Sequence, residues 1–565
     1  MNACQFSNLA FRKNSSYLHR YSIFAHYDLP VAELAPGRSA AERIAMEDTI
    51  DFRVVREIFK NAESMRLAMM QVQQPQADIS PATVRKYFVI AVLAHLFCWT
   101  VLPLFLQSNA ALDMLEGLAW GKEWQLGYEK DPPLFPWVIQ VLTQWSGKGL
   151  WISYLAGQLC VATVFFAVWQ LGQRVASVLE ALIGALLLEG VYYLSLPTLE
   201  LNDIVLQMPF SALFGWLLHK AIRADRLADW ILAGVVASLG LWSRYSMGAY
   251  IVPIAIFAVI HPFSRSRLRS KGPWFLILVC TLLFLPHLYW IVETDFISLK
   301  YVGHRAPQVH DTVSFLTQYM AFIGAQVLAL LPLLLVSLLL WRWRATKHWL
   351  RVRWEDFDFS YIATLALGPA VFSLVLSFSA QRPLRAMWGA PLWLFLGLFI
   401  VLLLRPVITR QRLHCLRRAW LLLLLFPMVY FVAEKKFGTA ITGNEQAVNF
   451  PGNSLGQAIN TRWRTMTGRP LKYVVGNTWT AGNVAFYARD RPSVIFSHGD
   501  QRLSPWAEAG DVRQAGAVIV WNVKLEGAAL PAYLASRFPG AVLQPSVTVT
   551  GKLPHQFGIA YVMPQ

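Results

Sequence analysis

A short acidic segment follows the first long apolar run of the chain. Asp113 and Glu116 open this segment, Lys130 and Asp131 close it, and it holds seven charged side chains in about twenty residues. Carboxylates placed where a chain leaves a bilayer cost desolvation free energy, so they indicate function more than stability. A carboxylate can act as a general base, and nearby cations can stabilise the negative charge that grows on a leaving group.

Further polar residues flank other apolar runs, at ends that we expect on the same side of the membrane as Asp113. They are Asn202, Asp203, Arg244, Tyr245, Asp295 and Arg385. Acids and cations offered together by several separate segments are what a reaction needs when it uses a base and a clamp for an anion.

Each of these residues also has a structural explanation. Asp203 can be a helix N-cap, because Asn and Asp are preferred there. Arg385 can anchor a span at the lipid headgroups, as arginine often does. Asp113 and Glu116 can belong to an ordinary solvated turn. These alternatives do not explain why so many such residues share one face.

The composition is that of a membrane protein. Hydrophobic residues make up 56% of the 565 residues and charged residues only 15%, against about 25% charged in soluble domains. The net charge of +17 could suggest a nucleic-acid partner. We exclude nucleic acid because the cations are dispersed over short loops beside the apolar runs.

The elements that must position these residues are membrane spans. We predict eleven, because each run approaches the length needed to cross hydrocarbon. They cover residues 86–107, 150–171, 175–195, 203–221, 228–242, 245–261, 273–292, 317–340, 359–380, 386–404 and 418–434. Residues 133–146 are apolar but short, which favours an interfacial helix.

The loop charges predict the orientation. If the first span runs outward, the inner loops hold 18 Lys and Arg residues and the outer loops eight. Cytoplasmic loops carry the excess of cations, so the N-terminus is expected in the cytoplasm and the C-terminus outside. We therefore predict a cytoplasmic, unstructured arm at 1–85, a transmembrane catalytic domain at 86–434 and a periplasmic domain at 435–565.

The C-terminal part changes character to mixed polar and apolar sequence with turn signals. Residues 471–475, 493–496 and 515–520 read as strands, and residues 482–488 as the start of a helix. Strands alternating with helices predict a small α/β domain.

The first outer loop carries a recognisable pattern. It reads Asp113, Glu116, Trp120-Gly121, Gly127-Tyr128 and Lys130-Asp131-Pro132-Pro133-Leu134. This pattern resembles the bacterial family 39 glycosyltransferases, the polytopic GT-C group that includes protein O-mannosyltransferases, the lipid A aminoarabinose transferase and lipopolysaccharide galacturonosyltransferases. Weaker matches follow in order at Glu189-Gly190, Asn202-Asp203, Arg244-Tyr245, 286–301 and 385–392. Asp131 stands where that branch usually has His, and Arg244 where the family typically has Lys.

The resemblance implies a fold, a donor and a reaction. The fold would be a GT-C fold of about eleven transmembrane helices in a bacterial inner membrane. The donor would be a polyprenyl-phosphate-linked sugar, and the acceptor a glycolipid such as lipopolysaccharide core or lipid A, another lipid, or a protein. Asp113 would be the catalytic base, assisted by Glu116. The donor phosphate would bind Lys130, Arg244 and Arg385, while Asp131, Asn202, Asp203, Tyr245 and Asp295 would position substrate.

Two questions stay open at this point. No ligand cluster in the sequence requires a metal, although a divalent cation bridging Asp113 and the phosphate is compatible with it. A transporter or flippase for a charged lipid or a lipid-linked sugar is the alternative function. Transporters, however, place ionisable groups near the membrane midplane.

Overall fold

The structure is a computed structural model that describes residues 79–565, except 148, 306–308, 310, 341–353, 444 and 498–502. Nearly all of the predicted N-terminal arm lies outside the described residues. The first described helix, α3 (Pro81–Leu106), begins five residues before the predicted span 86–107, inside the predicted arm. The Ser80 hydroxyl accepts a hydrogen bond from the Thr83 backbone N–H, and Pro81 occupies the first helical position, where no N–H is needed.

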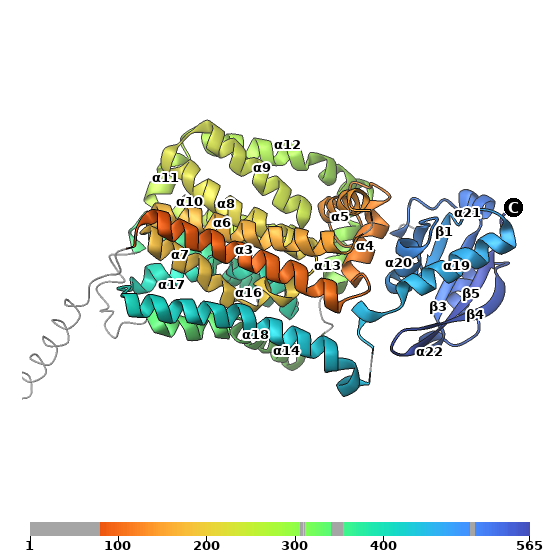
Figure 1. Cartoon of the computed structure of the whole chain (residues 1–565). Helices are drawn as coiled ribbons and strands as arrows, with labels where there is room; N and C mark the ends of the chain where they lie inside the picture. The colour runs from red at the N-terminus through yellow and green to blue at the C-terminus, as the bar shows by residue number, and fades with distance from the viewer. Residues whose placement is uncertain are drawn as a thin grey trace, which may run out of the picture. The chain divides into compact units, whose positions relative to one another are not determined.

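Residues 81–442 form a bundle of helices that run side by side (Figure 1). Several of these helices are short or bent. In chain order the helices after α3 are α4 (Leu112–Gly121), α5 (Leu134–Trp145), α6 (Trp151–Val175), α7 (Val178–Leu186), η2 (Leu187–Gly190), η3 (Tyr192–Leu194), η4 (Leu196–Thr198), α8 (Asp203–Ala224), α9 (Leu227–Ser243), η5 (Tyr245–Met247), α10 (Gly248–Ile260), α11 (Pro262–Arg267), α12 (Gly272–Glu293), α13 (Ile297–Arg305), α14 (Thr312–Ser337), η6 (Leu338–Leu340), α16 (Phe357–Ser379), η7 (Ala386–Trp393), α17 (Leu396–Leu404) and α18 (Arg410–Thr442).

Every predicted span corresponds to a helix or to a bent pair of helices. Six helices among the described residues are long and apolar enough to cross a membrane, or up to eight if each bent pair counts as one span. The bent pairs are 178–198, with a 91° break, and 386–404, with a 53° break. The remaining predicted spans are α8 and two shorter apolar helices, 227–243 and 245–260. These three do not reach that criterion alone.

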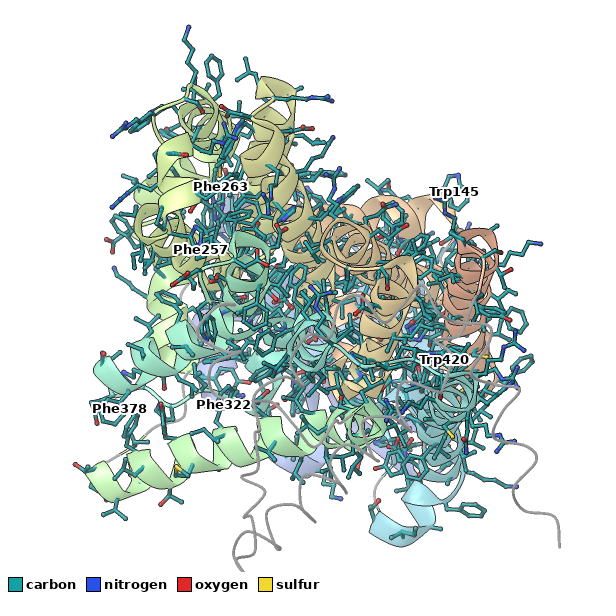
Figure 2. All side chains as sticks on the ribbon, turned by 90° about the vertical axis from the view of Figure 1, so that its left-hand side faces the viewer. Trp145, Phe257, Phe263, Phe322, Phe378 and Trp420 are labelled. Atoms are coloured by element: carbon teal, nitrogen blue, oxygen red, sulfur yellow. The ribbon has the colours of Figure 1, made fainter. Side chains whose placement is uncertain are left out.

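The outer faces of the bundle are apolar. Only 17% of the apolar window of α12 and 11% of that of α18 are buried inside the protein. Figure 2 shows side chains such as Trp145 and Phe378 pointing away from the bundle, and both are more than half exposed. Exposed apolar surface of this extent would be unfavourable in water, so these faces fit contact with lipid tails.

The C-terminal part is a small α/β domain, as the sequence predicts. Its helices are η8 (Ala447–Asn449), α19 (Gly452–Thr467), α20 (Thr478–Tyr487), α21 (Ala509–Ala515), α22 (Val523–Glu526) and α23 (Ala532–Arg537), and its strands are β1 (Tyr473–Gly476), β2 (Ser493–Phe496), β3 (Ala517–Asn522), β4 (Val542–Thr550) and β5 (Pro554–Val562). The sheet order is β2-β1-β3-β5-β4. Strand β1 runs parallel to β2 and β3, whereas β5 pairs antiparallel with β3 and β4.

Helix α20 of this domain packs directly on α4. A Cβ at Gly482 would lie 3.2 Å from the Leu115 Cβ, so the two helices touch closely there. The Ala110 backbone N–H donates to the Tyr487 hydroxyl at 3.0 Å, just before α4 begins. The α/β domain therefore supports the helix that carries Asp113 and Glu116.

Candidate active site

Helix α4 presents two carboxylates on one face. Asp113 lies in its first turn, and Glu116 follows three residues later, so the two side chains are neighbours on the helix surface. The helix is held tightly against α5, because a Cβ at Gly121 would lie 2.1 Å from the Pro136 carbonyl oxygen. The Trp-Gly pair of the loop pattern thus has a packing reason.

Glu116 is 8% exposed and forms an ion pair with Lys130. Burial raises the pKa of its carboxyl to about 7, against the opposing attraction of the lysine. The Lys130 ammonium also lies 5.7 Å from the Trp120 ring centroid and 5.8 Å from that of Tyr301. Lys130 is thereby fixed between the loop and α13.

Arg244 brings together two acids from distant parts of the sequence. It ends α9 and forms an ion pair with Asp203, the first residue of α8. Its Nη1 also lies 3.6 Å from a carboxylate oxygen of Asp131 in the first loop. Three of the predicted site residues, Arg244, Asp203 and Asp131, therefore meet. An arginine can contact carboxylates and still keep N–H donors for a phosphate.

Asn202 links this group to Asp113. Its side-chain oxygen accepts from the Val205 backbone N–H at 2.9 Å, so Asn202 is the N-cap of α8. The N-cap explanation considered for Asp203 therefore belongs to its neighbour. The Asn202 amide N–H2 also donates to Asp113 Oδ2 at 3.4 Å. Asn202 is thus placed to orient the Asp113 carboxylate.

Glu200 is a member of the site that the sequence reasoning missed. Its Oε2 is buried and has no hydrogen-bond partner within the described residues. Burial raises the pKa of its carboxyl, and the negative charge of Asp113 raises it further. The sequence signal was an acid between two leucines directly after an apolar run, only two residues before Asn202.

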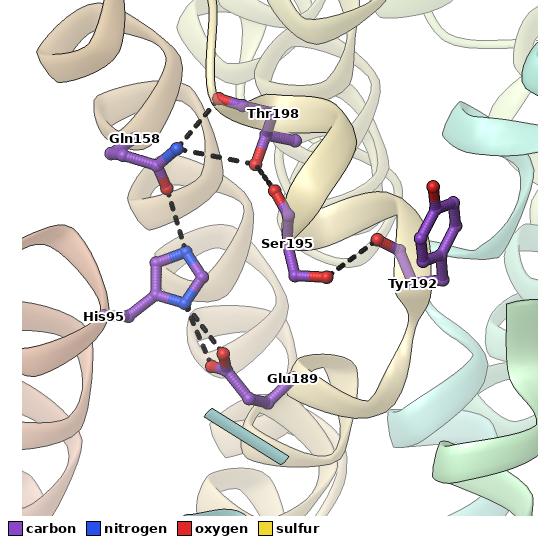
Figure 3. Close-up of polar contacts among 6 residues, drawn as sticks. All are labelled: His95, Gln158, Glu189, Tyr192, Ser195 and Thr198. Carbon is purple, nitrogen blue, oxygen red and sulfur yellow. Dashed lines mark hydrogen bonds and ion pairs between the residues drawn. The ribbon is translucent and has the colours of Figure 1, made fainter. Parts of the chain in front are cut away.

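A buried network fixes the bent segment that carries Glu200 (Figure 3). His95 of α3 contacts both carboxylate oxygens of Glu189 through Nδ1, at 3.0 and 3.1 Å, and Gln158 of α6 through Nε2, at 3.0 Å. The Gln158 amide N–H2 donates to the Thr198 carbonyl oxygen at 2.8 Å. Thr198 in turn donates its hydroxyl hydrogen to the Ser195 carbonyl oxygen at 2.7 Å.

This network has a defined direction. The Thr198 carbonyl can only accept, so Gln158 turns its own oxygen to His95, whose Nε2 must carry a hydrogen. On its other side, His95 Nδ1 faces both oxygens of the Glu189 carboxylate. A closed network of this kind positions the backbone around residue 198 and hence Glu200.

The Tyr245 hydroxyl forms hydrogen bonds with other side chains of the protein. The His287 Nδ1–H donates to the Leu126 carbonyl oxygen at 2.6 Å, which leaves Nε2 to accept from the Tyr245 hydroxyl at 2.8 Å. The Ser298 hydroxyl lies 2.7 Å from the same Tyr245 oxygen. Tyr245 thus ties the first loop and α12 to the start of α13, next to Arg244.

The two remaining predicted residues lie elsewhere. Asp295 forms an ion pair with Lys300, and both side chains are more than half exposed. Arg385 is the residue before η7, whose first carbonyl, that of Ala386, accepts from Tyr193 and Gln326. The structure brings together the other eight predicted residues through direct contacts and shared loops, whereas these two lie on separate segments.

The resulting cluster combines acids with two cations. Its carboxylates are Asp113, Glu116, Asp131, Glu200 and Asp203, and its cations are Lys130 and Arg244. Such a set can accept a proton at one carboxylate and stabilise an anion at an arginine or lysine. Within the described residues, no group of three or more His, Cys, Asp or Glu side chains is placed to hold a metal ion.

Comparisons with known proteins agree with this architecture. Residues 130–290 match the family model described as dolichyl-phosphate-mannose-protein mannosyltransferase. The chain is 22% identical over 211 residues to the lipid A galacturonosyltransferase RgtD of Rhizobium johnstonii. That match covers 36% of this chain and 43% of the relative, so the chain spans less than half of the relative's length in it.

Solved structures show the fold. The crystal structure of ArnT from Cupriavidus metallidurans bound to undecaprenyl phosphate superposes with a TM-score of 0.58 at 12% identity, over 85% of this chain and 98% of that one. The apo form of the same protein matches equally well, over 86% and 99%. The chain is a polytopic α-helical membrane protein with the GT-C fold and a small C-terminal α/β region, and the resemblance predicted from its first loop is confirmed.

Proposed function

We propose that this GT-C membrane protein is a glycosyltransferase that moves a sugar from a polyprenyl-phosphate-linked donor to a hydroxyl of an acceptor outside the cytoplasm. The observation that carries the proposal is the meeting of Asp113, Asn202, Asp203 and Arg244 at one end of the bundle. A similar protein is named a lipid A galacturonosyltransferase, and another was crystallised with undecaprenyl phosphate. These names favour a lipid-linked donor and a lipopolysaccharide-type acceptor, lipid A or core.

The reaction would need one proton transfer. The Asp113 carboxylate takes the proton of the acceptor hydroxyl while the hydroxyl oxygen bonds to the sugar C1 and the bond from C1 to the phosphate oxygen breaks. The lipid phosphate leaves with the electron pair of that bond. Asn202 holds Asp113 in place, and Glu200, kept protonated by burial, avoids a second negative charge beside it.

The anion clamp would be Arg244 with Lys130. Both now pair with carboxylates, so the phosphate would share or displace Asp203, Asp131 and Glu116. Arginine presents two N–H groups side by side, which match two phosphate oxygens. Arg385 and Asp295 remain proposed contacts from neighbouring segments, to the donor phosphate and to substrate, respectively.

We place the site on the periplasmic side of a bacterial inner membrane. The excess of Lys and Arg in the opposite loops supports this orientation, with the N-terminus in the cytoplasm and the 435–565 domain in the periplasm. A lipid-linked donor cannot leave the bilayer, so its enzyme must lie in the membrane. The contact between α20 and α4 keeps the α/β domain beside the proposed site.

One observation favours a transporter instead. His95 and Glu189 form an ionisable pair within the bundle, next to a bent span, and transporters use such pairs and broken helices. The pair is closed by further hydrogen bonds, which favours a structural role. Flux of a lipid-linked sugar across reconstituted vesicles, without sugar transfer, would support the transporter.

The test is replacement of Asp113 by Asn. We expect transfer to fall about 100- to 10,000-fold, because a positioned general base contributes about that much. The rate would be measured in membranes with equal amounts of folded protein, and the glycolipid masses of the strain would be compared with and without the gene. Glu508→Gln, an exposed acid in the C-terminal domain, is the control. Wild-type transfer by Asp113→Asn would refute the base assignment.

A further inference from the structure

A cavity with both apolar and polar lining residues lies on the side of α4 away from Asp113. It has a volume of about 200 Å³ and is lined by α4, α5 and the α/β domain. Helical geometry places the α4 lining residues 115, 118 and 122 about half a turn away from Asp113, with Ala119 at the edge of that face. The cavity is therefore separate from the proposed active site, although it shares a helix with it.

Arg491 lines this cavity, and two of its guanidinium nitrogens have no acceptor among the described residues. Its Nε and Nη2 are buried with no hydrogen-bond partner within the described residues. Burial lowers the pKa of this group. The Phe486 ring, with its centroid 5.6 Å from the guanidinium carbon, supplies a cation–π contact but no acceptor for these N–H groups.

A second cation faces the same space. The Lys122 ammonium donates to the Arg491 carbonyl oxygen at 2.6 Å and to the Ser493 hydroxyl at 3.1 Å. Burial lowers the pKa of Lys122, Glu123 opposes this, and the charges of Arg491 and Lys472 add to it. Lys472 itself is paired with Asp511. The negative charge of Glu123 thus opposes the two positive charges at the cavity, those of Lys122 and Arg491.

The remaining lining suits a group with several oxygens. Gln140 and Gln144 of α5 offer side-chain amides, and Leu115 and Phe486 close the apolar part. Arginine's Nε and Nη2 form a fork that matches two oxygens of a phosphate, and an ammonium serves a third. The volume exceeds the roughly 30 Å³ of one water several times.

We propose that this cavity between α4, α5 and α20 is an oxyanion site for a phosphate group, held by Arg491 and Lys122 with Gln140 or Gln144. The phosphate can be a free ion or the headgroup of a lipid. The site does not depend on the proposed transfer reaction, because it is argued from the unpartnered Arg491 guanidinium nitrogens and the neighbouring Lys122. Its occupation would join the α/β domain to the helix that carries the proposed base.

The experiment measures binding to the purified full-length protein. Thermal unfolding would be followed while inorganic phosphate is added at constant ionic strength, with chloride as the reference anion. A separate series would use phosphatidic acid in micelles, with phosphatidylcholine as the reference. A ligand that binds the folded state raises the midpoint temperature as its concentration increases.

The variants are Arg491→Gln and the neighbouring exposed Arg489→Gln. We expect the wild type and Arg489→Gln to be stabilised equally, and the apparent affinity to fall at least about tenfold in Arg491→Gln. Stabilisation by inorganic phosphate identifies a free-ion site, and stabilisation by phosphatidic acid alone identifies a lipid headgroup. Absence of both effects in the wild type, or equal effects in Arg491→Gln, overturns the proposal.

Two further variants cover the case in which Arg491→Gln does not fold. Arg491→Lys keeps the charge but loses the fork, and Lys122→Gln removes the second cation while leaving Arg491. Both should weaken phosphate binding and leave the unfolding temperature without phosphate closer to the wild type. If both bind phosphate as the wild type does, the cavity is not the binding site.

Discussion

Two charged groups of this protein differ in how completely their partners satisfy them. In the bundle, a chain of hydrogen bonds joins Glu189, His95, Gln158 and Thr198 in that order. Both ring nitrogens of His95 have an acceptor in this chain. At the end of the bundle, acids outnumber cations, and a buried oxygen of Glu200 has no hydrogen-bond partner in the part of the chain that the structure describes. The hydrogen bonds of the first group form a closed network, whereas those of the second group are incomplete among the described residues.

This difference distinguishes residues that support the structure from residues that can react with a substrate. A closed buried network fixes backbone positions, but it has no free group for a substrate. An incompletely paired cluster costs stability, and natural proteins accept that cost mainly where substrate completes the pairing. The comparison predicts that variants of the closed network lose stability, whereas variants of the open cluster lose activity.

The largest stability effect is expected for His95→Leu. It leaves Glu189 buried without its partner, which should cost about 3–5 kcal/mol of unfolding free energy. The double variant His95→Leu with Glu189→Leu should recover much of this loss, because no unpaired charge remains. Thermal unfolding of the purified variants decides this. A stable His95→Leu protein with no transfer activity would break the comparison, since the network would then be catalytic.

Arg244→Gln should act mainly on the reaction. It removes the cation that binds Asp203 and Asp131, and loss of one such donor costs about 100- to 1000-fold in rate. Transfer rates per folded molecule would be compared with those of Arg382→Gln, an exposed arginine before η7. Retained activity in Arg244→Gln would mean that the phosphate is bound elsewhere.

The third prediction concerns pH and Glu116, whose carboxyl pKa is raised to about 7. Between its ordinary pKa of about 4.5 and 7, the folded protein binds this proton more tightly than the unfolded chain, so stability falls as pH rises. The advantage of the wild type over Glu116→Gln should shrink by up to about 3 kcal/mol across that range. Unfolding curves of both proteins at pH 4.5, 6 and 8 provide the measurement. Parallel pH dependences would show that Glu116 does not titrate there.

Glu200→Gln should give the smallest effect. Glutamine resembles the protonated acid that burial and Asp113 favour, so transfer near pH 6.5 should change by less than about tenfold. The wild-type rate should change above neutral pH as Glu200 loses its proton, and the variant should lack this change. A large loss at pH 6.5 would indicate that the ionised Glu200, rather than the neutral acid, takes part in the reaction.

Much of the architecture follows from local signals in the sequence. Apolar runs of sufficient length predict helices, and all eleven predicted segments are helical, although α8–α10 are less clear as spans on their own. Strands β1, β2 and β3 of the C-terminal domain follow from short apolar runs between turn residues, whereas β4 and β5 were not predicted. The acidic first loop was visible because charge is rare beside spans, so Asp113, Glu116, Lys130 and Asp131 could be selected without a structure.

Only the tertiary structure decided which charges meet. His95 and Glu189 are 94 residues apart, and Arg244 meets acids from the first loop and from α8. Glu200 and Arg491 gain their importance from buried atoms that lack hydrogen-bond partners among the described residues, which no spacing in the chain reveals. The physical reason is that length and hydropathy act along the chain, whereas desolvation and pairing depend on neighbours brought together by packing.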